Sequence, residues 1–340
     1  MTTIVTSDLH FTDLPRDAYR WELFPWLRDS VRKYRAEDVL ILGDITDAKD
    51  RHSAALVNRL VKELHALSEV ATVWLLKGNH DYIDEATPFF GFAAHLDNVE
   101  YAGEPSITGN IGGATCAFLP STRNHEREWE GLDLSTCRWI FCHQTFTGAL
   151  AENGTELSGT PPAYFDDLPK SCRVVSGDIH VPQTLHKGRI TYVGSPYRIH
   201  FGDTFTPRVL LLDDSKMTDL HFPGVSRELV VARSVDELAA LDFPQLTQVK
   251  VRLKLPRAEY PDWSRRREEI RALTVERQWV LCGLELLLAE VKAAPSVRDD
   301  SAESDAEDRS PSEVVREYAR VNNLDREHLD AGCAFVVGAR

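Results

Sequence analysis

The sequence predicts an α/β fold: a layered β-sandwich with flanking helices, followed by a small α+β domain that would cap it. In the first eighty residues, short apolar segments alternate with stretches of helical periodicity. The 340 residues also exceed what one hydrophobic core usually serves. Together these two observations predict one large domain and a smaller one.

The large domain is expected to begin with parallel strands. Strands are predicted at Ile4–Thr6, Val39–Leu42 and Ala71–Leu76. Apolar residues at helical spacing predict helices within 17–36 and 53–68, between those strands. The resulting β-α-β-α-β order implies right-handed crossovers within one sheet.

The rest of this domain, which we place at residues 1–225, is richer in strands. The expected strands are Trp139–Cys142, Arg173–Val175, Ile190–Val193 and Val209–Leu212, and the last two look like closing strands.

A small α+β capping domain is predicted at residues 226–294. Ser234 is a candidate N-cap for a short helix, with Glu237 three residues later. The other expected elements are a strand at Gln248–Leu255, a helix at Arg265–Leu273 and one or more strands within Trp279–Val291.

An acidic linker is predicted at residues 295–312. Its central part, residues 298–309, holds six acids and two arginines and no apolar core residues, so we expect disorder. Residues 313–340 regain apolar content and predict a helical C-terminal tail. The tail either docks a partner, which the tether favours, or packs on the chain's own surface.

Composition sets limits on location and partners. The sequence contains no apolar run of about 18 residues, so no membrane span is expected. The six cysteines form no C-x-x-C pair and are expected to be reduced core thiols, which favours a cytoplasmic location. The net charge of −14 argues against a nucleic-acid partner. The acidic linker and bound divalent metal would account for part of that charge.

Acidic, amide and imidazole side chains follow five of the apolar segments. Ligand sites of α/β sheets lie at such strand ends, so we expect these side chains to converge. Oxygen and nitrogen donors without thiolate favour manganese, magnesium or iron. Two such ions about 3.5–4 Å apart could clamp a phosphoester. The candidate ligands are Asp8, His10, Asp44, Asn79, His143, Asp178 and His180, with Asp44 as the bridge between the two ions.

These segments resemble the five motifs of the calcineurin-like metallophosphoesterases, over about residues 1–215. The motifs are Asp8-Leu9-His10, Gly43-Asp44-Ile45-Thr46-Asp47, Gly78-Asn79-His80-Asp81, Cys142-His143-Gln144 and Gly177-Asp178-Ile179-His180. Within that superfamily the chain is similar to SbcD-type DNA repair nucleases, including their phage forms. The segments that carry this second likeness are Val193-Gly194-Ser195-Pro196 and Phe201-Gly202-Asp203.

The resemblance implies a role for each motif residue. His80 would donate a proton to the leaving oxygen or orient the substrate, and Asp81 would fix its tautomer. One metal would be held by Asp8, His10, Asp44 and His180, and the other by Asp44, Asn79, His143 and Asp178.

The chain departs from the family pattern at Asp178. The family usually has Gly-His-x-His where this chain has Gly177-Asp178-Ile179-His180. A carboxylate there suits manganese or magnesium as a ligand. A helix cap or a supporting contact behind the ligands is the alternative role.

Two sets of cations are candidates for substrate binding. Arg51 and His52 follow the second motif and would either contact substrate phosphate or belong to a solvated loop. Between Lys250 and Arg277, nine bases accompany five acids. This segment is either a solvated amphipathic surface or a patch that faces phosphate.

The resemblance therefore implies a two-metal hydrolase, with manganese as the expected ion, that cuts DNA phosphodiester bonds in repair or recombination. It also implies an SbcC-like SMC-family ATPase as partner and is compatible with a homodimer. A phosphodiesterase or phosphatase for small nucleotides is the first alternative, and a non-catalytic metal-binding scaffold is the second. The sequence leaves open whether such a nuclease is an exonuclease or an endonuclease.

Overall fold

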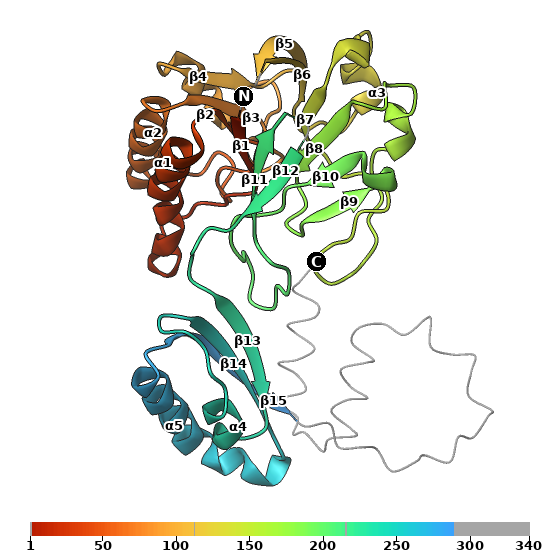
Figure 1. Cartoon of the computed structure of the whole chain (residues 1–340). Helices are drawn as coiled ribbons and strands as arrows, with labels where there is room; N and C mark the ends of the chain where they lie inside the picture. Colours follow the sequence, from red (N-terminus) through yellow and green to blue (C-terminus); the bar gives the residue numbers. More distant parts are fainter. Residues whose placement is uncertain (1, 112, 215, 289–340) are drawn as a thin grey trace, which may run out of the picture. The chain divides into compact units, whose positions relative to one another are not determined.

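The computed structural model describes residues 2–111, 113–214 and 216–288, which form three sheets (Figure 1). The expected linker and tail, and the last residues of the expected capping domain, lie outside these residues. The compact unit that holds the described residues extends over Met1–Ala289. The domain boundary at 225/226 therefore stays a prediction.

The first sheet contains the parallel strands that the sequence predicts. Its order is β12-β11-β1-β2-β3-β4, and β1 to β4 run parallel while β11 and β12 are antiparallel to their neighbours. The strands are β1 (Thr2–Thr6), β2 (Ala36–Ile41), β3 (Thr72–Leu76), β4 (Val99–Ala102), β11 (Val209–Asp213) and β12 (Lys216–Leu220).

Helices cover the outer face of this sheet. The segment expected as one helix over 17–36 is a 3-10 helix, η1 (Pro15–Glu22), followed by α1 (Leu23–Tyr34). The helix α2 (Ala54–Ser68) is capped by Ser53, whose side chain accepts a hydrogen bond from the backbone N–H of Leu56. Its leucines at helical spacing are buried against the sheet, which fixes the orientation of α2.

The second sheet has the order β5-β6-β7-β8-β10-β9. Its members are β5 (Ser106–Ile111), β6 (Ala114–Leu119), β7 (Trp139–His143), β8 (Arg173–Gly177), β9 (Gln183–Leu185) and β10 (Ile190–Tyr192). The two expected closing strands lie in different sheets, because β10 pairs with β8 and β9 while β11 pairs with β1 and β12. Short helical segments connect the strands: η2 (Phe89–His95), α3 (His125–Glu128), η3 (Leu134–Thr136), η4 (Pro162–Phe165) and η5 (His186–Gly188).

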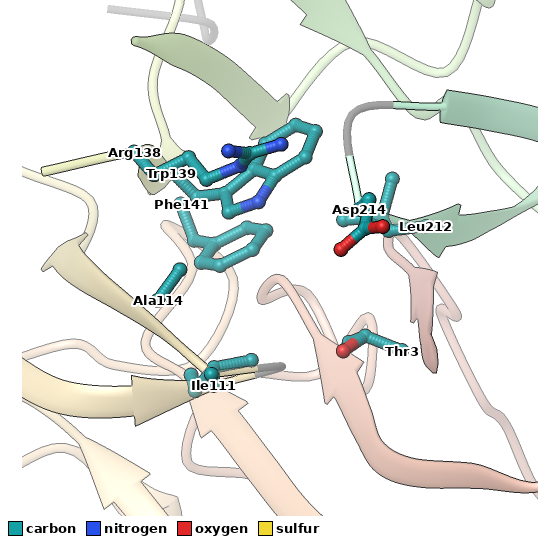
Figure 2. Close-up of a pocket in the computed structure, with 9 residues that line it drawn as sticks. Thr3, Ile111, Ala114, Arg138, Trp139, Phe141, Leu212 and Asp214 are labelled. Carbon is teal, nitrogen blue, oxygen red and sulfur yellow. The ribbon is translucent and has the colours of Figure 1, made fainter. Parts of the chain in front are cut away.

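An apolar layer joins the two large sheets into a sandwich. Leu40 and Leu76 of the first sheet pack in one cluster with Phe118 and Phe141 of the second. At the amino ends of β1 and β7 this layer borders a small pocket of about 90 Å³, shown in Figure 2. The candidate ligands follow the carboxyl ends of the same strands, so this pocket lies at the other end of the sheets.

A third sheet has its own core. Its parallel strands β13 (Arg227–Ala232), β14 (Gln248–Leu255) and β15 (Val280–Leu288) are joined through α4 (Val235–Ala239), η6 (Arg257–Asp262) and α5 (Trp263–Glu276). Ser234 caps α4 by accepting from the backbone N–H of Glu237, as its position in the sequence predicts. Val251, Leu253 and Ile270 belong to the apolar cluster of this sheet.

The cysteines of the described residues are free thiols. Cys116, Cys137, Cys142 and Cys172 are buried and Cys282 is partly buried, whereas Cys333 lies outside the described residues. In the part of the chain that the structure describes, no helix has the length and apolarity that a membrane crossing requires.

We expect Leu64→Ala to lower the free energy of unfolding by about 2–5 kcal/mol, because the substitution leaves a cavity under α2 where Leu64 is fully buried. Denaturant unfolding followed by circular dichroism measures the change. Val275→Ala is the matched helical control, since Val275 is 78% exposed and its loss should alter stability by about 0.5 kcal/mol or less. Equal effects of the two substitutions would contradict the placement of α2.

Candidate metal centre

Five loops from the two large sheets meet at the carboxyl ends of their strands. The loops after β1, β2 and β3 come from the first sheet, and those after β7 and β8 come from the second. Backbone hydrogen bonds link the first two loops, from Asp8 N to Gly43 O (3.2 Å) and from His10 N to Asp44 O (3.0 Å). The ring of His143 contacts the carbonyl oxygen of Leu42 through Nδ1 at 2.6 Å, which joins the second sheet to the first.

Four of the predicted ligands have left-handed backbone. The φ angles are 55° at Asp8, 43° at His10, 53° at Asp44 and 84° at Asp178. Aspartate and histidine adopt this region more often than most non-glycine residues do, but it is uncommon for all of them. Such strain persists where surrounding contacts enforce it and is typical of functional sites.

Two glycines allow the loops to approach closely. Gly43 has φ +83°, and a Cβ there would lie 2.4 Å from Nδ1 of His143 and 2.7 Å from Cα of Gly78. A Cβ on Gly78 would lie 2.3 Å from the backbone nitrogen of Asp44. The glycines of both motifs are therefore required by the contact between loops.

The first group of ligand atoms comes from Asp8, His10 and His180, whose donor atoms lie within 4.8 Å of one another. Nε2 of His10 and Nε2 of His180 are 3.1 Å apart. An oxygen of Asp44 lies 3.6 Å from Nε2 of His10. These four side chains are the set that the sequence assigned to one metal.

The second group surrounds Nε2 of His143. It lies 3.1 Å from Oδ1 of Asn79, 3.3 Å from Oδ1 of Asp44 and 3.7 Å from Oδ1 of Asp178. One oxygen of Asp44 thus faces each group, which is the arrangement that a bridging carboxylate requires. Asp178 presents its carboxylate to this second group, and its backbone N–H donates to Asp8 at 3.1 Å.

The donor sets fit two divalent cations. Asp8 and Asp44 are buried, with exposed fractions of 0% and 2%, and Asp178 lies beside them. Buried carboxylates packed this closely repel one another unless positive charge compensates them. The neighbouring donors are imidazole nitrogens and an amide oxygen, without thiolate, which suits hard or borderline divalent ions.

The pKa values of the ligand carboxylates and of His143 reflect their close contacts. Burial opposes ionisation of Asp44, but the neighbouring imidazoles, first that of His143, hold its pKa below the usual range. Burial also disfavours charge on His143, yet the Asp44 carboxylate raises the pKa of His143 well above its usual value. Burial raises the pKa of Asp178.

Asp81 has a different contact from the one we expected. We predicted that it would fix the tautomer of His80, but its carboxylate accepts hydrogen bonds from the backbone N–H groups of Asp44, Ile45 and Gly78 at 2.8–3.0 Å. Asp81 is fully buried and clamps the second and third motif loops together. Among the described contacts Asp81 has none with the ring of His80, so its predicted effect on that ring stays a prediction.

Asp47 faces His80 instead. Its Oδ1 lies 3.5 Å from Nδ1 of His80 and 3.2 Å from Nδ1 of His10, so one carboxylate contacts both rings. The hydrogen bond with His10 lowers the pKa of Asp47 to about 2. The sequence included Asp47 in the second motif without assigning it a role, although its position three residues after Asp44 could have indicated this contact.

Glu152 is a second side chain that the sequence did not single out. Its Oε1 lies 2.7 Å from Nδ1 of His180. Burial disfavours a charged His180 ring, but the carboxylates of Glu152, Asp8 and Asp44 together outweigh burial and raise the pKa of His180 to about 9. The His180 ring beside it lowers the pKa of Glu152 to about 2. No motif surrounds Glu152, so the sequence carried no signal for it.

The cations expected to bind substrate are placed differently from one another. Arg51 is exposed, whereas His52 contacts Thr46 at 2.6 Å and packs on Phe89 with ring centroids 4.1 Å apart. Their contact with phosphate stays a prediction. In the third sheet and α5, many of the bases form ion pairs, as in Lys250–Glu285, Arg252–Glu285, Arg265–Glu269 and Arg271–Glu268. This pairing favours a solvated amphipathic surface there.

The family model described as calcineurin-like phosphoesterase matches residues 1–182, more than half of the chain. The chain belongs to the calcineurin-like phosphoesterase family. Members of this family hydrolyse phosphoesters with two divalent metals, in agreement with the two ligand groups. No curated protein sequence matches the chain.

Solved structures resemble this phosphoesterase at low identity. A dimetal phosphatase from Danio rerio is 13% identical, with 66% of this chain and 95% of that chain covered and a TM-score of 0.43. The nuclease MPE from Pseudomonas putida is 14% identical, with 64% and 87% covered and a TM-score of 0.34. A cold-active protein tyrosine phosphatase is also 14% identical, with 64% and 77% covered and a TM-score of 0.33. Likenesses this weak do not discriminate between substrates.

We expect Glu152→Gln to weaken manganese binding about 10- to 100-fold, because the carboxylate that orients the His180 ring is lost. Isothermal titration calorimetry measures the affinity. Glu156→Gln is the control, because Glu156 is an exposed acid of the same loop and does not pair with His180. Unchanged affinity in Glu152→Gln would show that the ion pair has no part in metal binding.

Asp178→Asn should weaken binding of one of two manganese ions by about tenfold or more, because an uncharged amide replaces a carboxylate beside His143. Asparagine tolerates the left-handed backbone at this position, so the loop is preserved. Calorimetric stoichiometry and affinity are the readouts. Thr145→Val is the control, because it removes only the hydroxyl that donates to Asp178. Two ions bound at wild-type affinity by Asp178→Asn would assign Asp178 a supporting role.

Proposed function

We propose that this phosphoesterase hydrolyses DNA phosphodiester bonds as an SbcD-like, manganese-dependent nuclease. The observation that supports it is the position of His80 beside two ligand groups that share Asp44. Its backbone N–H donates to Asp44 at 2.8 Å, and its side chain is 35% exposed. A proton donor thus stands at the open edge of the centre, where a large substrate has access.

The catalytic chemistry follows from the groups around His80. Two divalent cations, when bound, activate a water and stabilise charge on the phosphoryl oxygens. Nδ1 of His80 faces Asp47 at 3.5 Å, so Nε2 is left to donate to the departing oxygen of the strand. Asp47 also contacts His10, which belongs to the first ligand group. Asp47 therefore links the position of His80 to that group.

The support for DNA comes from the likeness to SbcD-type nucleases in the segment after β10. That segment supports the centre in this structure: the Tyr197 hydroxyl donates to the carbonyl oxygen of Leu9, and Ser195 Oγ donates to the carbonyl of Tyr197 at 2.8 Å. It therefore holds the first motif loop in place. Exposure of Asn79 and His80 at the rim suits a polymer.

The two alternative functions require different residues at the metal centre. A small-substrate phosphodiesterase or phosphatase would use the same ligand groups, and the net charge of −14 suits it better than DNA. A non-catalytic scaffold is disfavoured because both ligand groups and His80 are present. The proposal includes an SbcC-like ATPase partner for the tail, which lies outside the described residues.

We expect the wild-type chain with manganese to cut linear duplex or single-stranded DNA, and His80→Ala to lose about 10²- to 10⁴-fold in rate while it still binds metal. Gel assays on both DNAs give the rate, and calorimetry gives metal binding. His95→Ala is the control, because the last residue of η2 belongs to neither ligand group.

A chromogenic phosphodiester run in parallel separates the alternatives. Cleavage of the small ester without any cleavage of DNA would favour a small-substrate enzyme or a required ATPase subunit, and adding that subunit distinguishes the two. Failure on all substrates, with manganese bound, would favour the scaffold.

A further inference from the structure

A polar pocket of about 240 Å³ adjoins the second ligand group. His143, Asn79 and Asp178 form part of its lining, and the loops after β2 and β6 contribute Lys49 and Arg123. Neither of these cations was singled out by the sequence as a substrate contact. The side chains of Lys49 and Arg123 therefore line the same pocket as the ligand group at which a phosphoester would react.

Lys49 and Arg123 have positive charge available for a ligand. Among the described residues, neither side chain forms a hydrogen bond or an ion pair, whereas bases such as Arg28 and Arg208 pair with acids at 2.8 and 3.1 Å. Lys49 is partly buried and Arg123 is exposed. An anion held between them would form charge-assisted hydrogen bonds.

The walls of the pocket are fixed by contacts between loops. The backbone N–H of Thr122 donates to Oε1 of Gln144 at 3.4 Å, and Nε2 of Gln144 donates to Thr160 at 3.1 Å. The backbone N–H of Ser121 donates to the carbonyl oxygen of Lys77 at 2.9 Å. The loop that carries Arg123 is therefore held against the loop after β7, and the pocket is largely formed before substrate arrives.

The size and lining of the pocket suit a phosphate better than a base. Its volume is below the roughly 300 Å³ at which small-molecule sites begin. Tyr82 supplies the only phenol ring of the lining and is 4% exposed, so the pocket offers no aromatic face on which a base could stack. Beside the ligands His143 and Asp178, the lining offers hydroxyls, two amides and two cations, which are groups that recognise a phosphate without reading sequence.

We propose that this pocket binds a second phosphate of the substrate, next to the scissile one, and that Arg123 determines the preference for substrates that carry this second phosphate. The inference rests on the proposed function and narrows it: the substrate class is a phosphodiester that carries a further phosphate on the adjoining nucleotide. A polynucleotide strand meets this requirement at each internal linkage, whereas an isolated diester does not.

The experiment compares the thymidine dinucleotide TpT, which has one phosphate, with pTpT and TpTp, which have two. The full chain with manganese should show a kcat/KM at least tenfold higher for one of the two-phosphate dinucleotides than for TpT, expressed mainly in KM. Arg123→Gln should reduce this ratio several-fold, and Lys49→Gln should reduce it in the same direction. Arg127→Gln is the matched control, because Arg127 is exposed on α3 and does not line the pocket.

Isothermal titration calorimetry with calcium in place of manganese measures the binding of the same three dinucleotides. This measurement does not depend on cleavage. An Arg123-dependent preference in binding without any cleavage would support the pocket and refute the phosphodiesterase. Cleavage of TpT with no preference in the wild type, or with a preference unchanged in Arg123→Gln, would refute the pocket and leave the proposed function standing. Equal binding of all three dinucleotides, without cleavage, would refute both.

Discussion

The buried carboxylate of Asp81 is the interaction on which the centre depends. It accepts hydrogen bonds from three backbone N–H groups in the loops that follow β2 and β3. The three donors offset part of the cost of burying this carboxyl group, but burial and the nearby Asp44 charge still raise the pKa of Asp81 to about 7. Because Asp44 and Gly78 are both held by it, Asn79 and His80 take their positions relative to Asp44 from this clamp.

Around the clamp, the protein concentrates negative charge and backbone strain. Asp8, Asp44 and Asp178 lie close together in left-handed backbone, with imidazoles between them. Such an arrangement is costly for the protein alone, and each cost is lowered by divalent ions. The fold thus holds the ligands in place before the metals bind, which is what two-metal chemistry requires of its scaffold.

A buried network links the first ligand group to the third sheet. Arg20 donates to the carbonyl oxygen of His10 and lies 3.4 Å from Asp17, which also receives a hydrogen bond from Arg227 at the start of β13. Arg227 in turn bonds Gln248 of β14 at 2.9 Å. Carbonyl and amide oxygens bond further donors of both arginines, which supports the buried ion pairs, while Nε of Arg20 has no hydrogen-bond partner among the described residues. The loop of His10 is therefore supported from outside the sandwich.

The sequence by itself determined the alternation of strands and helices around the first three motifs, because apolar periodicity and capping residues are local signals. It also indicated which polar residues follow strand ends and hence would converge. Only the tertiary structure placed β10 and β11 in different sheets and brought Glu152 to His180, Asp47 to His80 and Arg123 to the second ligand group. Glu152 is 28 positions from its partner, Asp47 is 33 from His80 and Arg123 is 20 from His143, and no period in a sequence encodes contacts across such separations. They arise when two sheets pack face to face and their loops meet.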